Sequence, residues 1–381
     1  MDPEIPYLTP AEFAILPWGW TPADADVLGE IRRCGFNLAG FIPPEALDLA
    51  GGAGLQAILF DESAHVSDSA AELDAQDVRQ RVGGLVSRAK GHPALFGYYL
   101  RDEPGVGSFA GLARWAQAYH AADPQGLAYL NLFPNYATPA QLGVESYTEY
   151  VERFVQVVAP PFLSYDHYAL MQDGSLRGSY FENLEVVRAA AMQAGIPFWN
   201  IVLANAHFDY AEPSAAGLRF QVYTTLAYGA RGISYFTYFA PDSGNYRLAA
   251  VDQFGDKTPT WDLLRQVNLQ IHRLGPTYLA LKSVHVFHTP ELPDGTLGPE
   301  TSRLVAEISA GSFVVGEFEA PDGRPHILVV NKDLQRAVAL AVRFQPPGKL
   351  LRTSPYSGKT APVGGEDLWL APGQGVLLGL D

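Results

Sequence analysis

Cysteine and positive charge are both scarce in this chain of 381 residues. Its single cysteine, Cys34, cannot form an internal disulfide and has no Cys-x-x-Cys partner for a zinc or redox site. Lysine and arginine number 26 against 41 aspartates and glutamates, which gives a formal net charge of -15. A surface with this balance repels phosphate backbones, so nucleic acid is not an expected partner.

Long hydrophobic runs are lacking as well. Nowhere do about eighteen apolar residues follow one another, so we expect no membrane-spanning helix and no membrane partner. The first residues, Met1 to Pro6, lack the basic and apolar regions of a signal peptide. We expect a soluble protein that is cytoplasmic or, where a leader has been removed, secreted. Nothing in the sequence indicates an oligomeric state.

The motifs of three other enzyme classes are missing. No Gly-x-Gly-x-x-Gly opens a helix to hold a dinucleotide, and the Gly-x-Ser-x-Gly of α/β-hydrolases is absent. The nine histidines are scattered, without the His-x-His pair at a strand end that a metal-dependent barrel hydrolase needs. We therefore expect neither a cofactor nor a metal, and keep a metal-dependent hydrolase only as a weaker alternative.

What the sequence does contain is an alternation of short β-rich runs and amphipathic helical patterns up to about residue 275. Eight such units indicate parallel strands and an α/β fold of the (β/α)8 TIM barrel type, with a doubly wound open sheet as the runner-up. The expected strands cover residues 13–17, 37–42, 55–60, 95–100, 127–132, 162–165, 198–203 and 233–238. The expected helices cover 23–34, 75–89, 109–121, 147–158, 181–194, 215–227 and 261–274, with a degenerate one at 44–52. Gly35, Gly195 and Gly275 are expected to end helices.

After Gly275 and Pro276 the pattern changes to strand-like runs separated by turns of the Pro-Asp-Gly type. We expect a barrel over residues 1–278 and, packed on it, an antiparallel β-sandwich accessory domain over 279–381. The expected sandwich strands cover residues 285–288, 304–308, 313–318, 326–330, 338–344 and 375–380.

The most informative strand end follows Gly97, where a buried apolar run stops abruptly in Arg101-Asp102-Glu103-Pro104. In such barrels catalytic groups stand at the carboxyl ends of the strands. Apolar or like-charged surroundings would raise the pKa of Glu103 and suit it to act as a general acid, with Asp102 orienting it or binding hydroxyl groups. The alternative is a structural rim in which Arg101 pairs with Asp102 or Asp61.

The ending Asp102-Glu103-Pro104 resembles the Asn-Glu-Pro or Asp-Glu-Pro signature of the clan A glycoside hydrolases. This resemblance implies a (β/α)8 barrel, a carbohydrate substrate, hydrolysis of a glycosidic bond without a cofactor, and Glu103 as the acid/base. In that clan the nucleophile is a glutamate at the end of strand 7. Here the expected strand 7 continues into Ala204 and Asn205 without a carboxylate, so the sequence departs from the clan pattern at that position.

A glycosidase needs a second carboxyl group, about 5 Å away for a nucleophile or roughly 6.5 to 9.5 Å away for a base that activates water. Asp166 is the first choice because it directly follows an apolar strand. We expect it to act as an inverting base, or as the nucleophile if the two groups are closer. The other candidates are Glu62, Asp209 and Glu212. Alternatively, Asp166 only fixes a neighbouring loop or His167.

Aromatic and amide side chains at the other strand ends are the candidates for sugar binding. Trp18 and Trp20 lie two residues apart, and a flat indole suits the apolar face of a sugar ring. The full set of expected substrate-binding residues is Trp18, Trp20, Glu62, Asp102, Asn131, Asn135, Tyr165, His167, Asn205, His207 and Tyr238. The acidic composition favours a neutral sugar unless a local basic pocket stands at the site. A glycan-binding barrel without catalysis is the main rival hypothesis.

Overall fold

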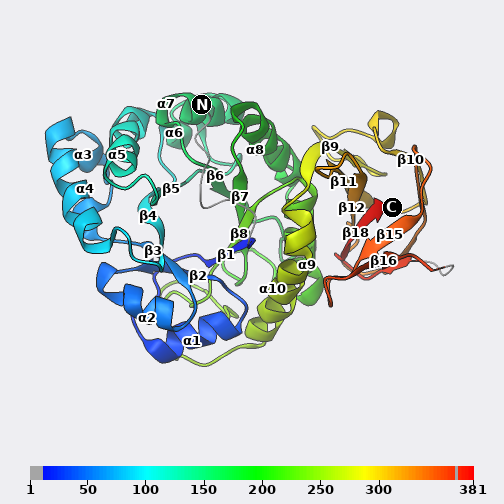
Figure 1. Cartoon of the computed structure of the whole chain (residues 1–381), viewed down its shortest axis with the longest axis horizontal. Coiled ribbons are helices and arrows are strands. Elements are labelled where there is room, and N and C mark those ends of the chain that lie inside the picture. The colour runs from blue at the N-terminus through cyan, green and yellow to red at the C-terminus, as the bar shows by residue number, and fades with distance from the viewer. Residues whose placement is uncertain (1–11, 365–367) are drawn as a thin grey trace.

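The computed structural model describes residues 12–364 and 368–381. The segment Met1 to Pro6, which the signal-peptide argument concerns, lies outside these ranges. Within them the chain forms a ring of strands surrounded by helices and, beside it, a sheet-rich part that contains the C-terminus (Figure 1).

The first part is a closed barrel of eight parallel strands. Two four-stranded sheets, of order β2-β3-β4-β5 and β1-β8-β7-β6, make it up. Leu132 bridges to Tyr165 at one seam, and Asn37 Oδ1 accepts the backbone N–H of Ile15 at 2.8 Å at the other. The closure confirms the (β/α)8 barrel over the open sheet. The strands are β1 (Ala14–Pro17), β2 (Leu38–Ile42), β3 (Gln56–Leu59), β4 (Leu95–Asp102), β5 (Leu127–Asn131), β6 (Leu163–Asp166), β7 (Phe198–Leu203) and β8 (Gly232–Phe236).

The helices begin at side-chain caps that the sequence supplies. Asp24, Asp74, Ser146 and Ser214 accept backbone N–H groups in the first turns of four helices, which satisfies donors without an intrahelical partner. The helices around the barrel are α1 (Ala25–Arg33), α2 (Leu47–Gly52), α3 (Asp68–Ala71), α4 (Ala75–Ala89), α5 (Phe109–Ala122), α6 (Pro139–Leu142), α7 (Tyr147–Val158), α8 (Tyr180–Ala194), α9 (Ala215–Ala227) and α10 (Pro259–Tyr278).

The expectation that Gly275 ends the last barrel helix is wrong, because α10 continues through Gly275 and Pro276 to Tyr278. A proline in the last turn removes one hydrogen bond there and leaves the rest of the helix intact. The guanidinium of Arg231 then donates to the carbonyl oxygens of Tyr278, Leu279 and Leu281. These charged donors satisfy the free carbonyl groups at the end of the helix. The helix therefore ends about one turn later than it would if Gly275 formed the C-terminal cap.

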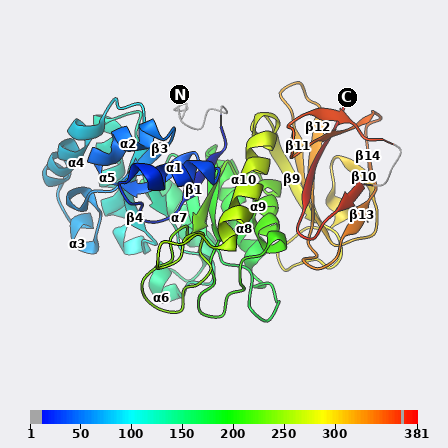
Figure 2. The same ribbon diagram turned by 90° about the horizontal axis from the view of Figure 1, so that it is seen from below.

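Side chains alternate between two cores along each barrel strand. On β5, Leu127 and Tyr129 join a cluster of residues inside the barrel, while Ala128 and Leu130 pack outward against the helices. The inner cluster is rich in aromatic rings, including Trp18 and Trp199. The barrel centre is therefore a packed core, and the long loops that project together from one end carry the open surface (Figure 2).

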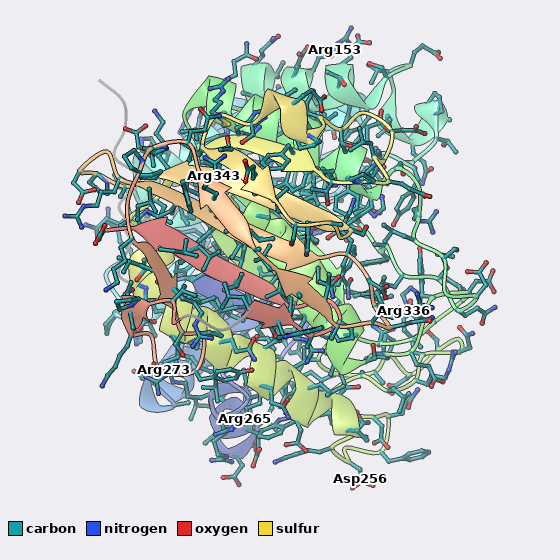
Figure 3. The ribbon with its side chains drawn as sticks, turned by 90° about the vertical axis from the view of Figure 1, so that its right-hand side faces the viewer. Arg153, Asp256, Arg265, Arg273, Arg336 and Arg343 are labelled. Atoms are coloured by element: carbon teal, nitrogen blue, oxygen red, sulfur yellow. The ribbon has the colours of Figure 1, made fainter. Side chains whose placement is uncertain are left out.

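The second part is an antiparallel β-sandwich. Its large sheet has the order β16-β15-β18-β12-β11-β9, and the pairs β10-β14 and β13-β17 cover it. In Figure 3 these sheets lie in front of the barrel helices. The strands are β9 (Lys282–His288), β10 (Val305–Ile308), β11 (Phe313–Glu319), β12 (Pro325–Asn331), β13 (Val338–Leu340), β14 (Val342–Phe344), β15 (Leu350–Thr353), β16 (Thr360–Pro362), β17 (Leu368–Leu370) and β18 (Gly375–Leu380).

Helix α9 joins the two parts. Its side chains are buried on almost every face, as expected for a helix enclosed between two layers. On β11, Phe313 and Val315 face the sandwich core, whereas Val314 packs in the barrel's cluster. At Gly316 a Cβ atom would lie 2.0 Å from the carbonyl oxygen of Ala227 at the end of α9, so only glycine allows this close approach.

Candidate active site

The ends of β4, β5 and β6 bring three carboxyl groups together around one amide. Asp102 on β4 is paired with Asn131 on β5, and Asp166 ends β6. The Asn131 side-chain Nδ2 donates to Asp102 Oδ1 at 3.0 Å and to Asp166 Oδ1 at 2.9 Å. Glu103 completes the group, because a side-chain hydrogen bond joins it to Asp166. We call Asp102, Glu103 and Asp166 the carboxyl cluster.

A chain of hydroxyl groups inside the barrel fixes the amide of Asn131. Ser164 Oγ donates to Asn131 Oδ1 at 2.9 Å and lies 3.0 Å from the Tyr129 hydroxyl. With its oxygen occupied in this way, the amide directs both N–H bonds at carboxylates. Asn131 is almost fully buried, so it holds the carboxyl cluster and has no surface left for a sugar hydroxyl.

The backbone turns sharply at Glu103. Its φ of 43° lies in the left-handed region, which costs a residue with a Cβ on the order of 1 kcal/mol. The turn is held on both sides: the Glu103 N–H donates to the Asn131 carbonyl at 2.9 Å, and the Tyr150 hydroxyl donates to the Pro104 carbonyl at 2.8 Å. Backbone strain of this kind gathers at functional sites.

The pKa of every member of the carboxyl cluster is raised, and for Glu103 and Asp166 repulsion between carboxyl groups adds to burial. Burial, and then the Asp102 charge, raises the pKa of Glu103 to about 7. Burial, and then the charges of Glu103 and Asp102, raises the pKa of Asp166 well above its ordinary value. The protein around its carboxyl group also raises the pKa of Asp102, whose residue surface at the end of β4 is otherwise exposed. Ionising both of two hydrogen-bonded carboxyl groups costs free energy, because the two negative charges repel each other. The pair of Glu103 and Asp166 therefore retains a shared proton near neutral pH.

Aromatic rings lie near the carboxyl cluster. We call the rings of Tyr136, Tyr168, His207, Tyr210 and Phe236 the aromatic wall. The ring of Tyr168 stacks on Phe236 with centroids 5.6 Å apart and meets the edges of His207 and Tyr210. Tyr136 lies on the same side, with Arg177 above its ring at 4.2 Å. These residues lie at or beyond strand ends in long loops, where periodicity gives no signal, and the site prediction did not include Tyr136, Tyr168, Arg177 or Tyr210.

Of the three expected sugar platforms, only Trp20 presents a large free face. Trp20 is 56% exposed, whereas Trp18 is 7% exposed and makes edge contacts with Phe41, Tyr99 and Tyr129 inside the barrel. Tyr238 is 1% exposed, so the expected platform role does not fit its position.

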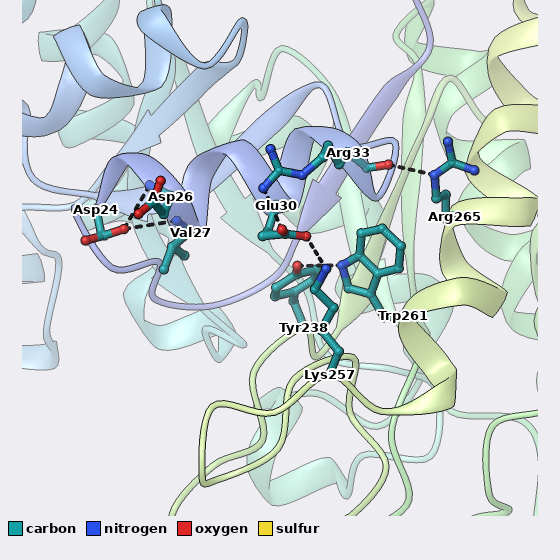
Figure 4. A network of polar contacts seen from close by, with 9 residues as sticks. All are labelled: Asp24, Asp26, Val27, Glu30, Arg33, Tyr238, Lys257, Trp261 and Arg265. Atoms are coloured by element: carbon teal, nitrogen blue, oxygen red, sulfur yellow. Dashed lines mark hydrogen bonds and ion pairs between the residues drawn. The ribbon is translucent and has the colours of Figure 1, made fainter.

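Tyr238 is held in place between the last barrel loop and the first helix. Its hydroxyl accepts the indole N–H of Trp261 at 3.0 Å. Lys257 lies over the Trp261 ring and pairs with Glu30 of α1 (Figure 4). Tyr238 therefore belongs to a structural network.

Tyr165 and His167 flank Asp166 in the sequence but do not accompany it in space. Tyr165 is fully buried in the layer between strands and helices, because alternation along β6 turns it away from Ser164 and Asp166. His167 is also fully buried, against the rings of Tyr136 and Tyr180. Neither has a surface that a substrate could touch.

The other polar candidates form contacts within the loops. Asn135 donates from its backbone to Asn183 Oδ1 at 2.7 Å and from its side chain to the Ser179 carbonyl at 3.0 Å. Asn205 is fully buried with its Oδ1 2.8 Å from His207 Nδ1, and His207 stacks on Tyr246 at 4.6 Å. All three shape the loops around the mouth.

The remaining acidic candidates form no hydrogen bond or ion pair with the carboxyl cluster among the described residues, and two of them have other partners. Glu62 is exposed, Asp209 accepts from Gln172 Nε2 at 3.3 Å, and Glu212 pairs with Arg247 at 3.2 Å.

The alternative of a salt-bridged rim is wrong in its pairings. Arg101 pairs with Asp68, and Asp61 pairs with Arg88. Neither arginine compensates the carboxyl cluster.

Two general properties of the described residues bear on the chemistry. Residues 12–364 and 368–381 include no group of three or more histidine, cysteine or acidic side chains arranged to hold a metal ion. In the same ranges, no helix combines the length and the apolar character needed to cross a bilayer.

Comparisons with known proteins add information on the fold. By sequence, the chain matches no protein-family model and no curated protein. Solved structures similar to it include a β-galactosidase from Bacillus circulans sp. alkalophilus (TM-score 0.68, 8% identity, 97% of this chain and 99% of that one). A family 5 glycoside hydrolase from Bacteroides vulgatus has a TM-score of 0.61 at 14% identity, over 97% of this chain and 89% of that one.

A third similar structure is a β-galactosidase from the psychrophilic Marinomonas ef1. It has a TM-score of 0.56 at 10% identity, and the match covers 70% of this chain. This chain spans 62% of the length of that enzyme. At these identities the likeness concerns the fold: this chain has the barrel architecture of solved glycoside hydrolases, together with a C-terminal β domain.

Proposed function

We propose that this protein is a glycoside hydrolase that cleaves O-glycosidic bonds, with Glu103 as the general acid and Asp166 as the second catalytic carboxyl group. The observation that carries the proposal is the hydrogen-bonded pair of Glu103 and Asp166 at the carboxyl ends of β4 and β6. The fold shared with solved glycoside hydrolases and the Asp102-Glu103-Pro104 signature support it.

The hydrogen bonds around the pair favour a particular division of roles. The proposed mechanism needs the shared proton on Glu103 and the negative charge on Asp166, and the N–H that Asn131 donates to Asp166 helps to hold that charge. Glu103 then gives this proton to the leaving glycosidic oxygen as the bond to the anomeric carbon breaks. A pKa of about 7 suits it to be protonated before this step and ionised after it.

The contact between the two carboxyl groups favours retention of configuration. An inverting enzyme keeps its carboxyl groups roughly 6.5 to 9.5 Å apart so that a water molecule fits between them. Groups that hydrogen-bond to each other are closer than that. In the proposed mechanism the Asp166 carboxylate attacks the anomeric carbon. Ionised Glu103 then takes a proton from water, whose oxygen displaces Asp166.

The test is sugar release from a broad panel of oligosaccharides and polysaccharides, with binding measured in parallel. We expect the parent to hydrolyse a member of the panel and Glu103→Gln to bind that substrate without turnover. Glu149→Gln, on the outer face of α7 and paired with Arg153, is the matched control and retains activity. The anomer released first, observed by NMR, distinguishes retention from inversion.

The rival hypothesis of a non-catalytic glycan-binding barrel predicts a different pattern. In that case the parent and Glu103→Gln bind sugar alike, and neither releases product. Hydrolysis by Glu103→Gln at the parental rate would likewise contradict the role given to Glu103.

A further inference from the structure

One arginine at the mouth of the barrel has no acidic partner. Arg177 lies in the loop between β6 and α8, and in the described part of the chain it forms no ion pair. Other arginines on this end of the barrel have partners: Arg101 pairs with Asp68 and Arg247 with Glu212.

Neutral groups hold the guanidinium of Arg177 in a fixed orientation. Its Nε donates to the Tyr168 carbonyl at 3.2 Å, and its Nη2 to the Tyr210 hydroxyl at 3.3 Å. The Tyr136 ring lies 4.2 Å below it and the Tyr210 ring 5.6 Å away. No acceptor among residues 12–364 and 368–381 takes a hydrogen bond from Nη1. Nη2 also donates to Met171 Sδ at 3.8 Å, so Nη1 is the nitrogen whose N–H bonds are left for a partner.

The aromatic wall links Arg177 to the carboxyl cluster. The Tyr136 ring lies 5.0 Å from that of His167, the residue after Asp166, and Tyr168 follows one residue later. Burial and then the Asp166 charge raise the pKa of both tyrosines, in keeping with this placement. Arg177 touches both of them, through the ring of Tyr136 and the carbonyl of Tyr168. Arg177 thus contacts two residues that lie near Asp166, on the loop that follows β6.

We propose that Arg177 binds the carboxylate of an acidic sugar, so that the substrate is a saccharide containing uronic acid. This inference rests on the proposed hydrolase function, because it places the acidic unit next to the bond that is cleaved. A guanidinium held in place by neutral groups, with donors left on Nη1, is well suited to pair with a carboxylate. Arg177 is the local basic group that reverses the preference for neutral sugars which the acidic composition predicts.

The test measures binding in the Glu103→Gln variant, which is expected to hold substrates without cleaving them. The probes are oligogalacturonides and glucuronate-containing disaccharides, their carboxyl-reduced neutral counterparts, and a sulfated disaccharide, each studied by calorimetry. We expect the acidic probe to bind roughly tenfold or more tightly than its reduced counterpart, as one charged hydrogen-bonded pair provides. This preference should weaken as salt is added.

Adding Arg177→Gln should remove the preference and leave binding of the neutral probe unchanged, whereas Arg177→Lys should retain part of it. Arg153→Gln removes the same charge from the outer surface of α7 and is the matched control (Figure 3). The inference is overturned if Glu103→Gln binds acidic and reduced probes alike, or if the sulfated probe binds best. It is also overturned if Arg177→Gln weakens both classes equally, since Arg177 would then only clamp the loops.

Turnover by the parent separates this inference from the function on which it rests. If Arg177-dependent binding of uronates occurs without any hydrolysis, the hydrolase proposal fails and the acidic-sugar site remains. If the parent hydrolyses saccharides and Arg177→Gln hydrolyses the uronate-containing ones as well as the parent does, the hydrolase proposal holds and the assignment of Arg177 fails.

Discussion

The two parts of this protein each hold a glutamate at least partly out of solvent, and its surroundings differ between them. In the sandwich, Glu317 on β11 is fully buried, and donors surround its carboxylate: the Ser302 hydroxyl at 2.5 Å and the backbone N–H groups of Arg303, Leu304 and Val305 at 2.9 to 3.3 Å. In the barrel, Glu103 faces other carboxyl groups. The first arrangement stabilises a negative charge, and the second destabilises one.

The difference shows how to distinguish a structural acid from a chemical one. A buried carboxylate with several donors fixes the backbone that supplies them, here the start of β10, and gains nothing from changing its charge. A carboxyl group beside Asp102 and Asp166 gains or loses a proton at little cost near neutral pH. Under the proposed function, the barrel uses in chemistry the type of side chain that the sandwich uses to hold a loop.

The largest effect should come from removing the acid in the barrel. We expect Glu103→Gln to lower kcat by about 10²- to 10⁴-fold, the usual contribution of a general acid, while substrate affinity changes little. Single-turnover kinetics on a substrate found with the panel measures this loss. A loss of less than tenfold would mean that Glu103 is not the proton donor.

The matching change in the sandwich should affect stability and leave the chemistry intact. Glu317→Gln replaces a carboxylate oxygen with an amide N–H group, which faces other hydrogen-bond donors and has no acceptor there. We expect this change to lower the free energy of unfolding by about 2 to 4 kcal/mol. Urea unfolding measures this change, with the exposed Glu319→Gln on the same strand as the control. If kcat per folded molecule fell as well, the division of roles between the two glutamates would be wrong.

Sequence patterns were sufficient for most of the fold because burial leaves a clear trace in them. All eight barrel strands appear within one or two residues of their expected starts, since parallel strands covered on both faces are continuous apolar runs. Strands β15, β16 and β17 were missed. They are three or four residues long and mostly exposed or half-buried, so they carry neither an apolar run nor an alternation.

The site was predictable only as far as strand ends determine it. Counting strand ends selected Glu103 and Asp166, which prove to be neighbours in space. The order of strand ends does not predict that Tyr165 turns outward or that Asn131 bridges two carboxylates. It also does not predict that Arg177 lies over the ring of Tyr136. These facts depend on the register between β5 and β6 and on the path of long loops, and neither leaves a periodic signal.

The pH dependence of stability provides a smaller and independent test of the contrast. The folded protein raises the pKa of Glu103 from its ordinary 4.5 to about 7, so between these values the folded state holds a proton that the unfolded chain has lost. The stability from this proton is complete below about pH 4.5 and is lost as the pH rises through about 7. We expect unfolding free energies to fall across this window in the parent and to fall less in Glu103→Gln. An equal decline in both proteins would contradict the raised pKa.

The smallest effect should be a shift in the pH profile of activity. The Asp102 charge is the second cause, after burial, of the raised pKa of Glu103. Removing this charge in Asp102→Asn should lower that pKa, so the general acid loses its proton at a lower pH. We expect the alkaline limb of kcat/KM, near pH 7 in the parent, to move down by about one unit or less. Because burial remains, the limb should stay above the ordinary glutamate range. An unchanged limb would mean that burial alone sets the pKa, and an upward shift would mean that the limb reports a group other than Glu103.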